Sequence, residues 1–371
     1  MKNSIVLGLA GVLLNGLLFG PGRLQLRQLT AGDFPQFYIG ARLAGTPAEY
    51  DIGGVLQDQR QVLGATRPGL MPSRLPFYYM LLRPLSRLPF SSAYTVWLVA
   101  MFSAAVSAIV LMTLAEGNAA IAVSLWSAPL FLATCAAQDV GLVYLVLAGG
   151  LLLRKCGRCV AAGLVLSLLS IKFNLFLLLP IPFLVKREFR LLGGAAAGLG
   201  VLTAISFAGA GQSWPVEYVR LVLNPVVSPG PTVMPNLHGA VSRFSNSALL
   251  EALLTVFIAA LVFVVARRSQ FSIALAAGLF GSILVSRHAY SGDCAVLIPA
   301  FLAVFRFGRS PAGQIAMICM TPFPYFLEDE LDLGWIPAGL FLLIVVTLSF
   351  NAIVGARSRE LGSQDMASTD S

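Results

Sequence analysis

The chain has 371 residues, of which 57% are hydrophobic and only 11% are charged, and its mean hydropathy is +0.82. A soluble domain carries about a quarter of charged residues, so this composition excludes an ordinary soluble globular protein. The net charge of +8 is explained by basic cytoplasmic loops, and no aromatic and basic nucleic-acid module occurs, so we expect no nucleic-acid partner.

Apolar runs recur from Ser4 to Val354. Only helices and closed barrels satisfy their backbone hydrogen bonds in lipid, and these runs lack the alternation of barrel strands. We therefore expect an all-α, polytopic transmembrane bundle of about ten to twelve spans. One domain should cover residues 1–356, followed by a disordered cytoplasmic tail over residues 357–371. The first run resembles a signal sequence, but no cleavage site follows it, so it is taken as the first span.

Clusters of Lys and Arg indicate the orientation, because short cytoplasmic loops collect positive charge. Five clusters are placed in the cytoplasm: Arg154-Lys155-Arg158, Lys186-Arg187-Arg190, Arg267-Arg268, Arg306-Arg309 and Arg357-Arg359. The expected spans are 4–20, 93–115, 119–138, 140–153, 191–209, 252–266, 271–286, 294–305, 312–327 and 335–354. Two long extracytoplasmic loops result, 21–75 and 210–251, the first with interfacial helices. The acidic segment 328–332 is expected as a solvated outer turn.

The stretch Val160–Val185 has basic clusters on both sides, although its length is that of a single span. One crossing would place one of these clusters outside. Two short helices that turn at Lys172, or a re-entrant pair, keep both clusters inside and bring Lys172 to the outer end or to membrane depth. An ionisable residue at that depth is costly and is by default a functional candidate.

Familiar soluble-enzyme motifs are absent from the sequence: there is no Walker loop, no Gly-x-Ser-x-Gly and no Asp-x-Asp. Of the five cysteines, Cys156 and Cys159 form a lone pair with no second pair or histidine nearby. A structural zinc ion needs four ligands, so we expect no zinc site there.

Asp33 lies beyond the first apolar run and is surrounded by Phe34, Phe37 and Tyr38. A carboxylate at the lipid boundary with apolar neighbours can be tuned to act as a base. An Asp before Phe-Pro equally fits the cap of an interfacial helix that begins near Pro35. The residues alone leave both roles open.

Several short motifs follow one another in a recognisable order. The first are Gly32-Asp33-Phe34 with Tyr38, Tyr50-Asp51, Leu75-Pro76-Phe77-Tyr78, Leu88-Pro89-Phe90 and Ala93-Tyr94-x-x-Trp97. Later ones are Gln138, Ala162-Gly163 before Lys172, Trp214 with Tyr218, Pro235-Asn236-Leu237-His238-Gly239, and His288-Ala289-Tyr290 with Asp293 and Leu297-Ile298-Pro299. From about Asp33 to about Pro299 the chain resembles glycosyltransferase family 87, multi-span enzymes of the GT-C superfamily. It departs from the family pattern at Ala137 and Phe173.

The resemblance implies an inverting transfer of a sugar, usually mannose, from a polyprenyl-phosphate carrier to a glycolipid or polysaccharide hydroxyl. It implies an active site on the extracytoplasmic face of the cell membrane, no metal or other cofactor, and Asp33 as general base. The leaving lipid phosphate needs fixed cations. Lys172, Arg287 and His288 are expected to bind it, because all three fall at outer ends of the expected spans.

Six further residues are expected to bind the sugar or the acceptor: Tyr38, Asp51, Gln138, Trp214, Asn236 and His238. Several have simpler roles, namely an interfacial aromatic for Trp214, loop caps for Asp51 and Asn236, and a hydrogen-bonding surface histidine for His238. A transporter or lipid flippase is the alternative function, although the internal repeat of such proteins is not visible. A second alternative is a non-catalytic protein of GT-C fold that binds lipid-linked sugars.

Overall fold

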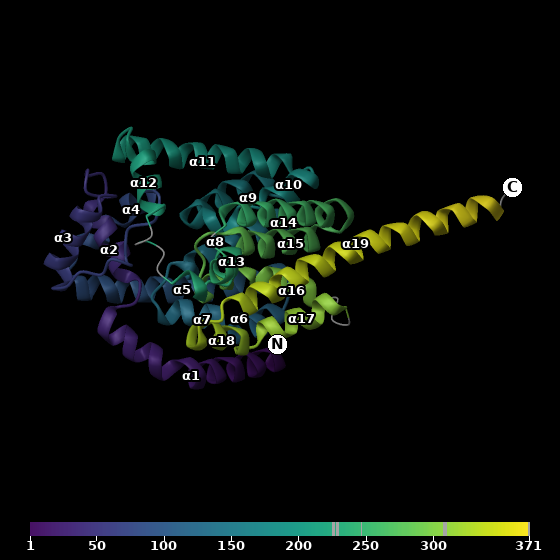
Figure 1. The fold of residues 1–371 in the computed structure, drawn as a ribbon, viewed down its shortest axis with the longest axis horizontal. Coiled ribbons are helices and arrows are strands. Elements are labelled where there is room, and N and C mark those ends of the chain that lie inside the picture. The colour runs from purple at the N-terminus through teal and green to yellow at the C-terminus, as the bar shows by residue number, and fades with distance from the viewer. Residues whose placement is uncertain (225–226, 228–229, 246, 307–309, 370–371) are drawn as a thin grey trace. The chain divides into compact units, whose positions relative to one another are not determined.

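The computed structural model describes residues 1–224, 227, 230–245, 247–306 and 310–369, with side chains for all of these except 21–30 and 356–369. In this part of the chain every regular element is helical, which confirms the all-α prediction (Figure 1). The chain divides into two compact units. Unit 1 comprises Met1–Phe173, Arg190–Pro231 and Ser291–Val296, and unit 2 comprises Asn174–Phe189, Thr232–Tyr290 and Leu297–Ser371.

Unit 1 carries the N-terminal half of the chain and the long helix that follows the second basic cluster. Its helices are α1 (Lys2–Thr30), α2 (Phe34–Leu43), α3 (Ile52–Leu63), α4 (Pro76–Leu82), η1 (Leu85–Arg87), α5 (Phe90–Glu116), α6 (Ala119–Trp126), α7 (Ala128–Cys135), α8 (Val140–Lys155), α9 (Cys159–Leu166), most of η2 (Ser167–Phe176), α11 (Phe189–Ala210), α12 (Trp214–Val222) and most of η5 (Ser291–Leu297). Helices α9 and α11 approach closely: a Cβ on Gly163 would lie 2.0 Å from the Leu191 oxygen, and one on Gly194 would lie 2.2 Å from the Val160 oxygen. Small residues permit such contact between apolar helices.

Unit 2 carries most of the C-terminal half of the chain. Its helices are α10 (Pro180–Val185), η4 (Pro231–Val233), α13 (Leu237–Phe244), α14 (Ala248–Arg268), α15 (Phe271–Val285), α16 (Ile298–Phe305), α17 (Pro311–Met320), α18 (Phe323–Leu331) and α19 (Trp335–Thr369). Helix α15 is apolar along its whole length and buried at nearly every position, and it packs against α14, α16 and α19 (Figure 1). A helix that is apolar on all sides is expected at the centre of a bundle.

Six helices of the described chain are long and apolar enough to cross a membrane: Lys2–Gly20, Phe90–Glu116, Cys159–Phe176, Phe189–Ala210, Ala248–Arg268 and Trp335–Gly355. Three apolar helices are shorter: Phe271–Val285, Ser291–Phe305 and Pro311–Met320. A straight crossing needs roughly 20 residues, so the six long helices define a multi-pass membrane protein.

The expected ten to twelve spans are not all continuous helices. The expected span 119–138 is divided at Ser127, whose side chain accepts a hydrogen bond from the Leu130 N–H and caps α7, while Pro129 lies in the first turn. Proline has no backbone N–H and cannot donate a hydrogen bond to the turn before it. The apolar run therefore forms two short helices. Helix α1 also differs from the expected first span, because it continues past Gly20 to Thr30.

The acidic segment 328–332 was expected as a solvated outer turn; Glu330, Leu331 and Asp332 are exposed, but the expectation is corrected for Glu328. Residues up to Leu331 belong to α18, and Glu328 is fully buried. Tyr325 and Glu328 are three residues apart and both are buried. Residues three apart share one face of a helix, so the apolar face of α18 carries Glu328 inward with Tyr325.

The C-terminal segment differs from the disordered tail expected over residues 357–371. Helix α19 continues to Thr369, and residues 370–371 lie outside the described residues. The segment contains Arg, Glu, Leu, Gln and Met and no proline, so its residues favour continuation of the helix.

The predicted break at Lys172 is confirmed. Within η2, Lys172 has φ −129° and ψ 54°, which interrupts the helix that begins with α9. This geometry places an ionisable side chain at a backbone break inside an apolar segment.

Labelling of single cysteines in intact cells tests the predicted orientation. On a background without the five native cysteines, Thr46→Cys is expected to react with an impermeant maleimide, because Thr46 is exposed in the loop predicted to lie outside. Arg158→Cys and Arg187→Cys, also exposed, are expected to react only after permeabilisation. Reaction of Arg187→Cys in intact cells would contradict the paired-helix interpretation of Val160–Val185.

Candidate active site

Asp33 directly precedes α2, which begins where the sequence predicts an interfacial helix. Its side chain makes no capping hydrogen bond, so the structure does not support a capping role for Asp33. The Asp33 N–H instead donates to the Ala136 carbonyl at 2.8 Å. Gly32 has φ +58°, and a Cβ there would lie 2.2 Å from the same oxygen, so only glycine permits this approach. Asp33 is thereby held beside the end of α7, at the turn that leads into α8.

Aromatic packing fixes the backbone around this contact. Phe34 and Phe37 are fully buried, and their ring centroids lie 5.9 Å and 4.8 Å from that of Trp97. The Trp97 Nε1–H donates to the Ala137 carbonyl at 2.8 Å. The Tyr38 hydroxyl donates to the Leu88 carbonyl, also at 2.8 Å, so this predicted sugar-binding residue has a structural contact.

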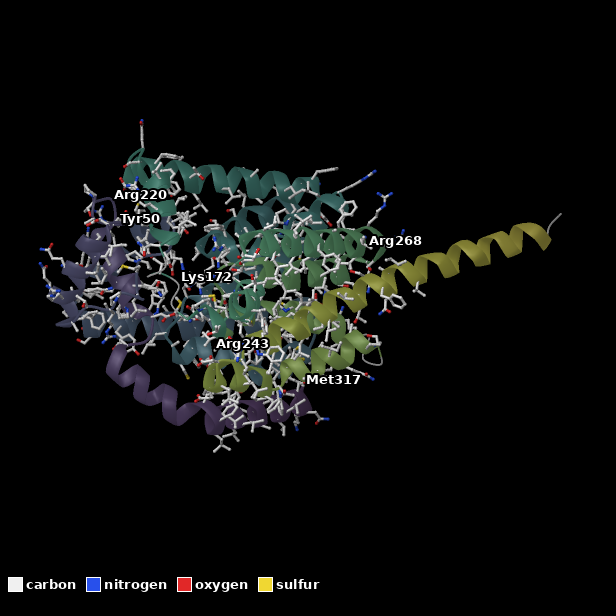
Figure 2. The ribbon with its side chains drawn as sticks, in the orientation of Figure 1. Tyr50, Lys172, Arg220, Arg243, Arg268 and Met317 are labelled. Atoms are coloured by element: carbon white, nitrogen blue, oxygen red, sulfur yellow. The ribbon has the colours of Figure 1, made fainter. Side chains whose placement is uncertain are left out.

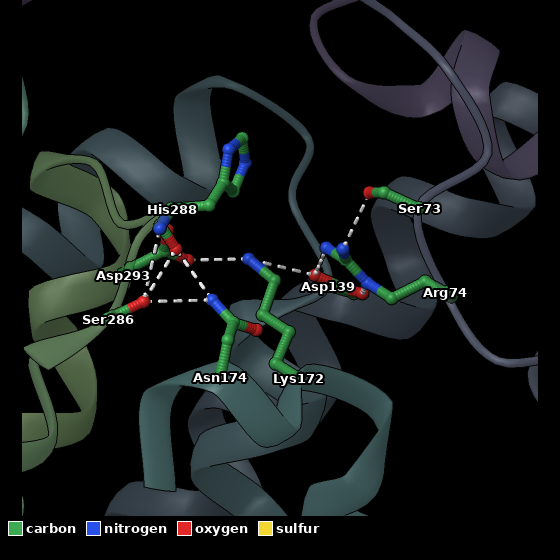
Figure 3. Close-up of polar contacts among 8 residues, drawn as sticks. All are labelled: Ser73, Arg74, Asp139, Lys172, Asn174, Ser286, His288 and Asp293. Carbon is green, nitrogen blue, oxygen red and sulfur yellow. Dashed lines mark hydrogen bonds and ion pairs between the residues drawn. The ribbon is translucent and has the colours of Figure 1, made fainter. Parts of the chain in front are cut away.

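A buried cluster of ion pairs lies beside Asp33 in unit 1 (Figure 3). The Arg74 guanidinium contacts Asp139 through Nε–Oδ2 at 2.8 Å and Nη2–Oδ1 at 3.1 Å. The Lys172 ammonium lies 2.5 Å from Asp293 Oδ1 and 3.3 Å from Asp139 Oδ1, and Figure 3 shows it between the two carboxylates. All four side chains are at most 8% exposed, so these charges interact with little screening.

Arg74 is held at its backbone as well as at its side chain. Its carbonyl accepts a hydrogen bond from the Tyr50 hydroxyl at 2.8 Å, and its N–H donates to the Tyr79 oxygen at 3.1 Å. Its guanidinium lies 5.6 Å from the centroid of the Phe37 ring. Figure 2 labels Tyr50, the residue that donates to the Arg74 carbonyl, and Lys172 of the same cluster. The loop before α4 therefore presents Arg74 to Asp139 in one fixed position.

The carboxyl groups of Asp33 and Asp139 differ in proton affinity. Burial raises the pKa of Asp33 above its usual value, against the lowering effects of the Lys172 charge and a hydrogen bond with Gln138, and Asp293 and Asp139 raise it further. Burial alone would also raise the pKa of Asp139, but Arg74 and Lys172 lower it to about 2. Asp139 is thus ionised at neutral pH, whereas half-buried Asp33 has the stronger affinity for a proton.

The structure brings together three residues that the sequence singled out, namely Asp33, Gln138 and Lys172. It adds Asp139, Asp293 and Arg74, which were not among the expected site residues. One signal for Asp139 was available, because it is a charged residue between two apolar runs and follows Gln138 directly. No local pattern connects it to Arg74, which lies 65 positions earlier.

Three of the expected sugar-binding residues have local structural roles. Asp51 accepts from the Gly54 N–H at 2.7 Å and caps α3, and Asn236 accepts from the Gly239 N–H at 2.8 Å and caps α13. Trp214 begins α12 and packs its ring 5.4 Å from that of Phe207. The capping roles are confirmed, and sugar binding by these residues stays a prediction.

In unit 2, Arg287 and His238 line a cavity of about 210 Å³. His238 Nδ1 lies 2.9 Å from Glu251 Oε1, and the remaining lining residues are Val241, Ser242, Ser245 and Ala248. Arg287 is exposed and forms no hydrogen bond or ion pair with any described residue. The cavity therefore has a cation available for a ligand.

His288 lies in the same unit as Arg287. Its carbonyl accepts hydrogen bonds from Asn174 Nδ2 at 2.5 Å and Ser286 Oγ at 3.0 Å (Figure 3), and its ring meets that of Tyr290 edge-on at 5.1 Å. Lys172 belongs to unit 1, so the convergence of all three on one phosphate stays a prediction. Over the described residues, no group of three or more His, Cys, Asp or Glu side chains is arranged to hold a metal ion.

The apolar helices and the charged cluster beside Asp33 define a multi-pass membrane protein with a buried cluster of ion pairs. The family model of glycosyltransferase family 87 matches residues 76–287, which is more than half of the 371-residue chain. The chain therefore belongs to glycosyltransferase family 87 and is a glycosyltransferase, as the sequence motifs predicted. Asp139 and Lys172 lie within the matched residues, and Asp33 and Asp293 lie outside them. No curated protein and no solved structure gives a significant match.

Proposed function

We propose that the protein transfers a hexose, with mannose favoured, from a polyprenyl-phosphate carrier to a hydroxyl of a glycolipid or polysaccharide. The transfer takes place at the extracytoplasmic face of the cell membrane and needs neither a metal nor another cofactor. The Asp33 carboxylate supports this proposal. It is half-buried, it does not cap a helix, and its pKa is raised beside a fixed cluster of charges. A carboxylate of that kind suits removal of a proton from a hydroxyl.

The proposed reaction is a single displacement. As the acceptor oxygen attacks the anomeric carbon from the face opposite the lipid phosphate, Asp33 takes the hydroxyl proton. The bond from the anomeric carbon to the acceptor oxygen forms, the bond to the phosphate oxygen breaks, and its electron pair stays on the phosphate. Attack from the opposite face inverts the anomeric configuration. Because an alcohol is a poor nucleophile, the base acts during the attack rather than before it.

The stereochemistry of the product tests the single displacement. Purified protein is incubated with a polyprenyl-phosphate sugar of known anomeric configuration and a glycolipid extract, and the new glycosidic linkage is assigned by NMR. We expect the opposite configuration to that of the donor. Retention would contradict direct attack by the acceptor and would require two successive displacements.

Arg287 is proposed to bind the donor phosphate together with His288. It is an unpaired cation beside a cavity that also offers the hydroxyls of Ser242 and Ser245. Arg287→Ala is expected to weaken donor binding by about 1.5 to 3 kcal/mol, the contribution of a charge-assisted hydrogen bond. Arg287→Lys should recover only part of it, because an ammonium cannot make the two parallel bonds of a guanidinium. The measurement is a scintillation proximity assay with labelled polyprenyl-phosphate sugar.

Arg243→Ala is the matched control for this substitution. Arg243 is an exposed arginine of the same unit, and its Nη1 donates to the Asp332 carbonyl at 3.0 Å outside the cavity. Its removal is expected to leave donor affinity unchanged. Equal affinity of the Arg287→Ala protein and the native protein would exclude Arg287 from the phosphate site.

A further inference from the structure

Lys172 is surrounded by groups that do not suit a phosphate ligand. The sequence predicts that it binds the donor phosphate, but its ammonium contacts Asp293 at 2.5 Å and Asp139 at 3.3 Å. Its side chain is only 7% exposed. A phosphate that reached Lys172 would have to displace at least one of these carboxylates or lie beside both.

The formal charges of the cluster lead to the same conclusion. Arg74 and Lys172 supply two positive charges, and Asp33, Asp139 and Asp293 supply three negative ones when ionised. Carboxylates thus outnumber cations by one before any substrate binds. An added phosphate would face uncompensated like charge, which costs several kcal/mol when water is excluded. The cluster has no positive charge left over for the donor.

The contacts around Gln138 connect Lys172 and its partner to Asp33. The Gln138 side chain lowers the pKa of the Asp33 carboxyl, and a Cβ on Gly292 would lie 2.6 Å from Gln138 Oε1. The residue that follows Gly292 is Asp293, the closest partner of Lys172. The turn before α8 and the start of η5 are therefore in direct contact, and the Lys172–Asp293 pair lies within electrostatic reach of Asp33.

We propose that Lys172 is a positioning residue whose positive charge keeps the Asp33 carboxylate ionised, and that Lys172 does not bind the donor phosphate. This proposal rests on the proposed role of Asp33 as the base. The groups that face Asp33 are Lys172 from η2, Gln138 and Asp139 from the turn before α8, and Asp293 from η5. Arg74 acts one step further away, because it pairs with Asp139.

The pH dependence of kcat/KM gives the test, with labelled polyprenyl-phosphate sugar as donor and a glycolipid extract as acceptor. A base must be deprotonated, so the rate falls as pH falls through the pKa of Asp33. Lys172→Met removes a charge that lowers this pKa, so the acid limb should move up by about 1 to 3 pH units. Activity lost near neutral pH should return at higher pH. Asp293→Asn removes a charge that raises the same pKa, so its acid limb should move down.

Donor affinity and a conservative variant distinguish this role from phosphate binding. Lys172→Arg keeps the charge and should keep the acid limb near its original pH. A lower donor affinity of Lys172→Met, with its acid limb unmoved, would overturn the proposal and restore Lys172 to the phosphate site. If Lys172→Met does not fold, Lys172→Gln is measured in its place, and an unmoved acid limb there overturns the proposal equally. Full activity of Asp33→Asn would instead refute the role of Asp33 as base, a result distinct from either of these.

Discussion

Asp33→Asn is expected to lower the rate of sugar transfer by about 10²- to 10⁴-fold, the usual contribution of a general base. Asparagine has nearly the same shape but cannot accept the acceptor's proton. Because the Asp33 side chain forms no cap hydrogen bond, the substitution should leave the start of α2 intact. Affinity for the polyprenyl-phosphate donor should therefore survive. Turnover with labelled donor and donor binding are measured on the same preparation.

Two further substitutions show whether the loss of turnover is specific to the Asp33 carboxylate. Asp33→Glu keeps the carboxylate but moves it, so partial activity is expected. Asp58→Asn changes an aspartate of the same segment, predicted to lie outside, whose carboxylate pairs with Arg42 at 2.9 Å and which is not among the expected site residues. Its turnover should equal that of the native protein. Near-native turnover of Asp33→Asn would return Asp33 to a structural role.

Asp139→Asn is expected to cause the largest loss of stability, about 3 to 5 kcal/mol, the usual cost of removing one partner of a buried ion pair. Asp139 is fully buried, and the substitution leaves Arg74 without its counter-charge and Lys172 with only Asp293. The contribution also depends on pH. Since the folded protein lowers the pKa of Asp139 from 3.8 to about 2, its stabilisation is present above the unfolded value and is lost as pH falls through about 2.

The pair between exposed Arg42 and buried Asp58 is the matched control, because solvent reaches one of its two charges. Its Nε–Oδ2 distance is 2.9 Å, close to that of the Arg74–Asp139 pair, but the Arg42 side chain is 37% exposed. Asp58→Asn should cost less than Asp139→Asn, about 1 kcal/mol, because the Arg42 guanidinium left behind remains accessible to solvent. Thermal unfolding in detergent, followed by tryptophan fluorescence, compares both variants with the native protein. Equal losses in the two would mean that burial of the Asp139 cluster does not matter.

Features that depend on neighbours in sequence could be predicted. Apolar runs indicated a helical membrane protein, Pro35 indicated the start of α2, and basic clusters on both sides of Val160–Val185 indicated a break at Lys172. Each of these follows from local composition and backbone chemistry. The number of long helices was harder to predict. Pro129 divides the run 119–138, whose hydropathy alone resembles that of one span.

The charged cluster could not be predicted, because it depends on contacts between distant segments. Asp139 and Arg74 are 65 positions apart, and Lys172 and Asp293 are 121 apart. The sequence showed that Lys172 was costly in an apolar segment, but not which groups would offset its charge. Glu328 illustrates the same limit, because its acidic neighbours suggested solvent while the helical face that it shares with Tyr325 is buried.

Transfer of a labelled sugar by purified protein is the decisive measurement for the donor class and for the role of Asp33. The native protein and Asp33→Asn are each given a labelled polyprenyl-phosphate sugar or a labelled sugar nucleotide, with the same glycolipid extract as acceptor. Label is expected to reach the acceptor only from the polyprenyl-phosphate donor and only with the native protein. Transfer from the sugar nucleotide alone, or equal transfer by both proteins, would contradict a polyprenyl-phosphate-dependent glycosyltransferase with Asp33 as its base.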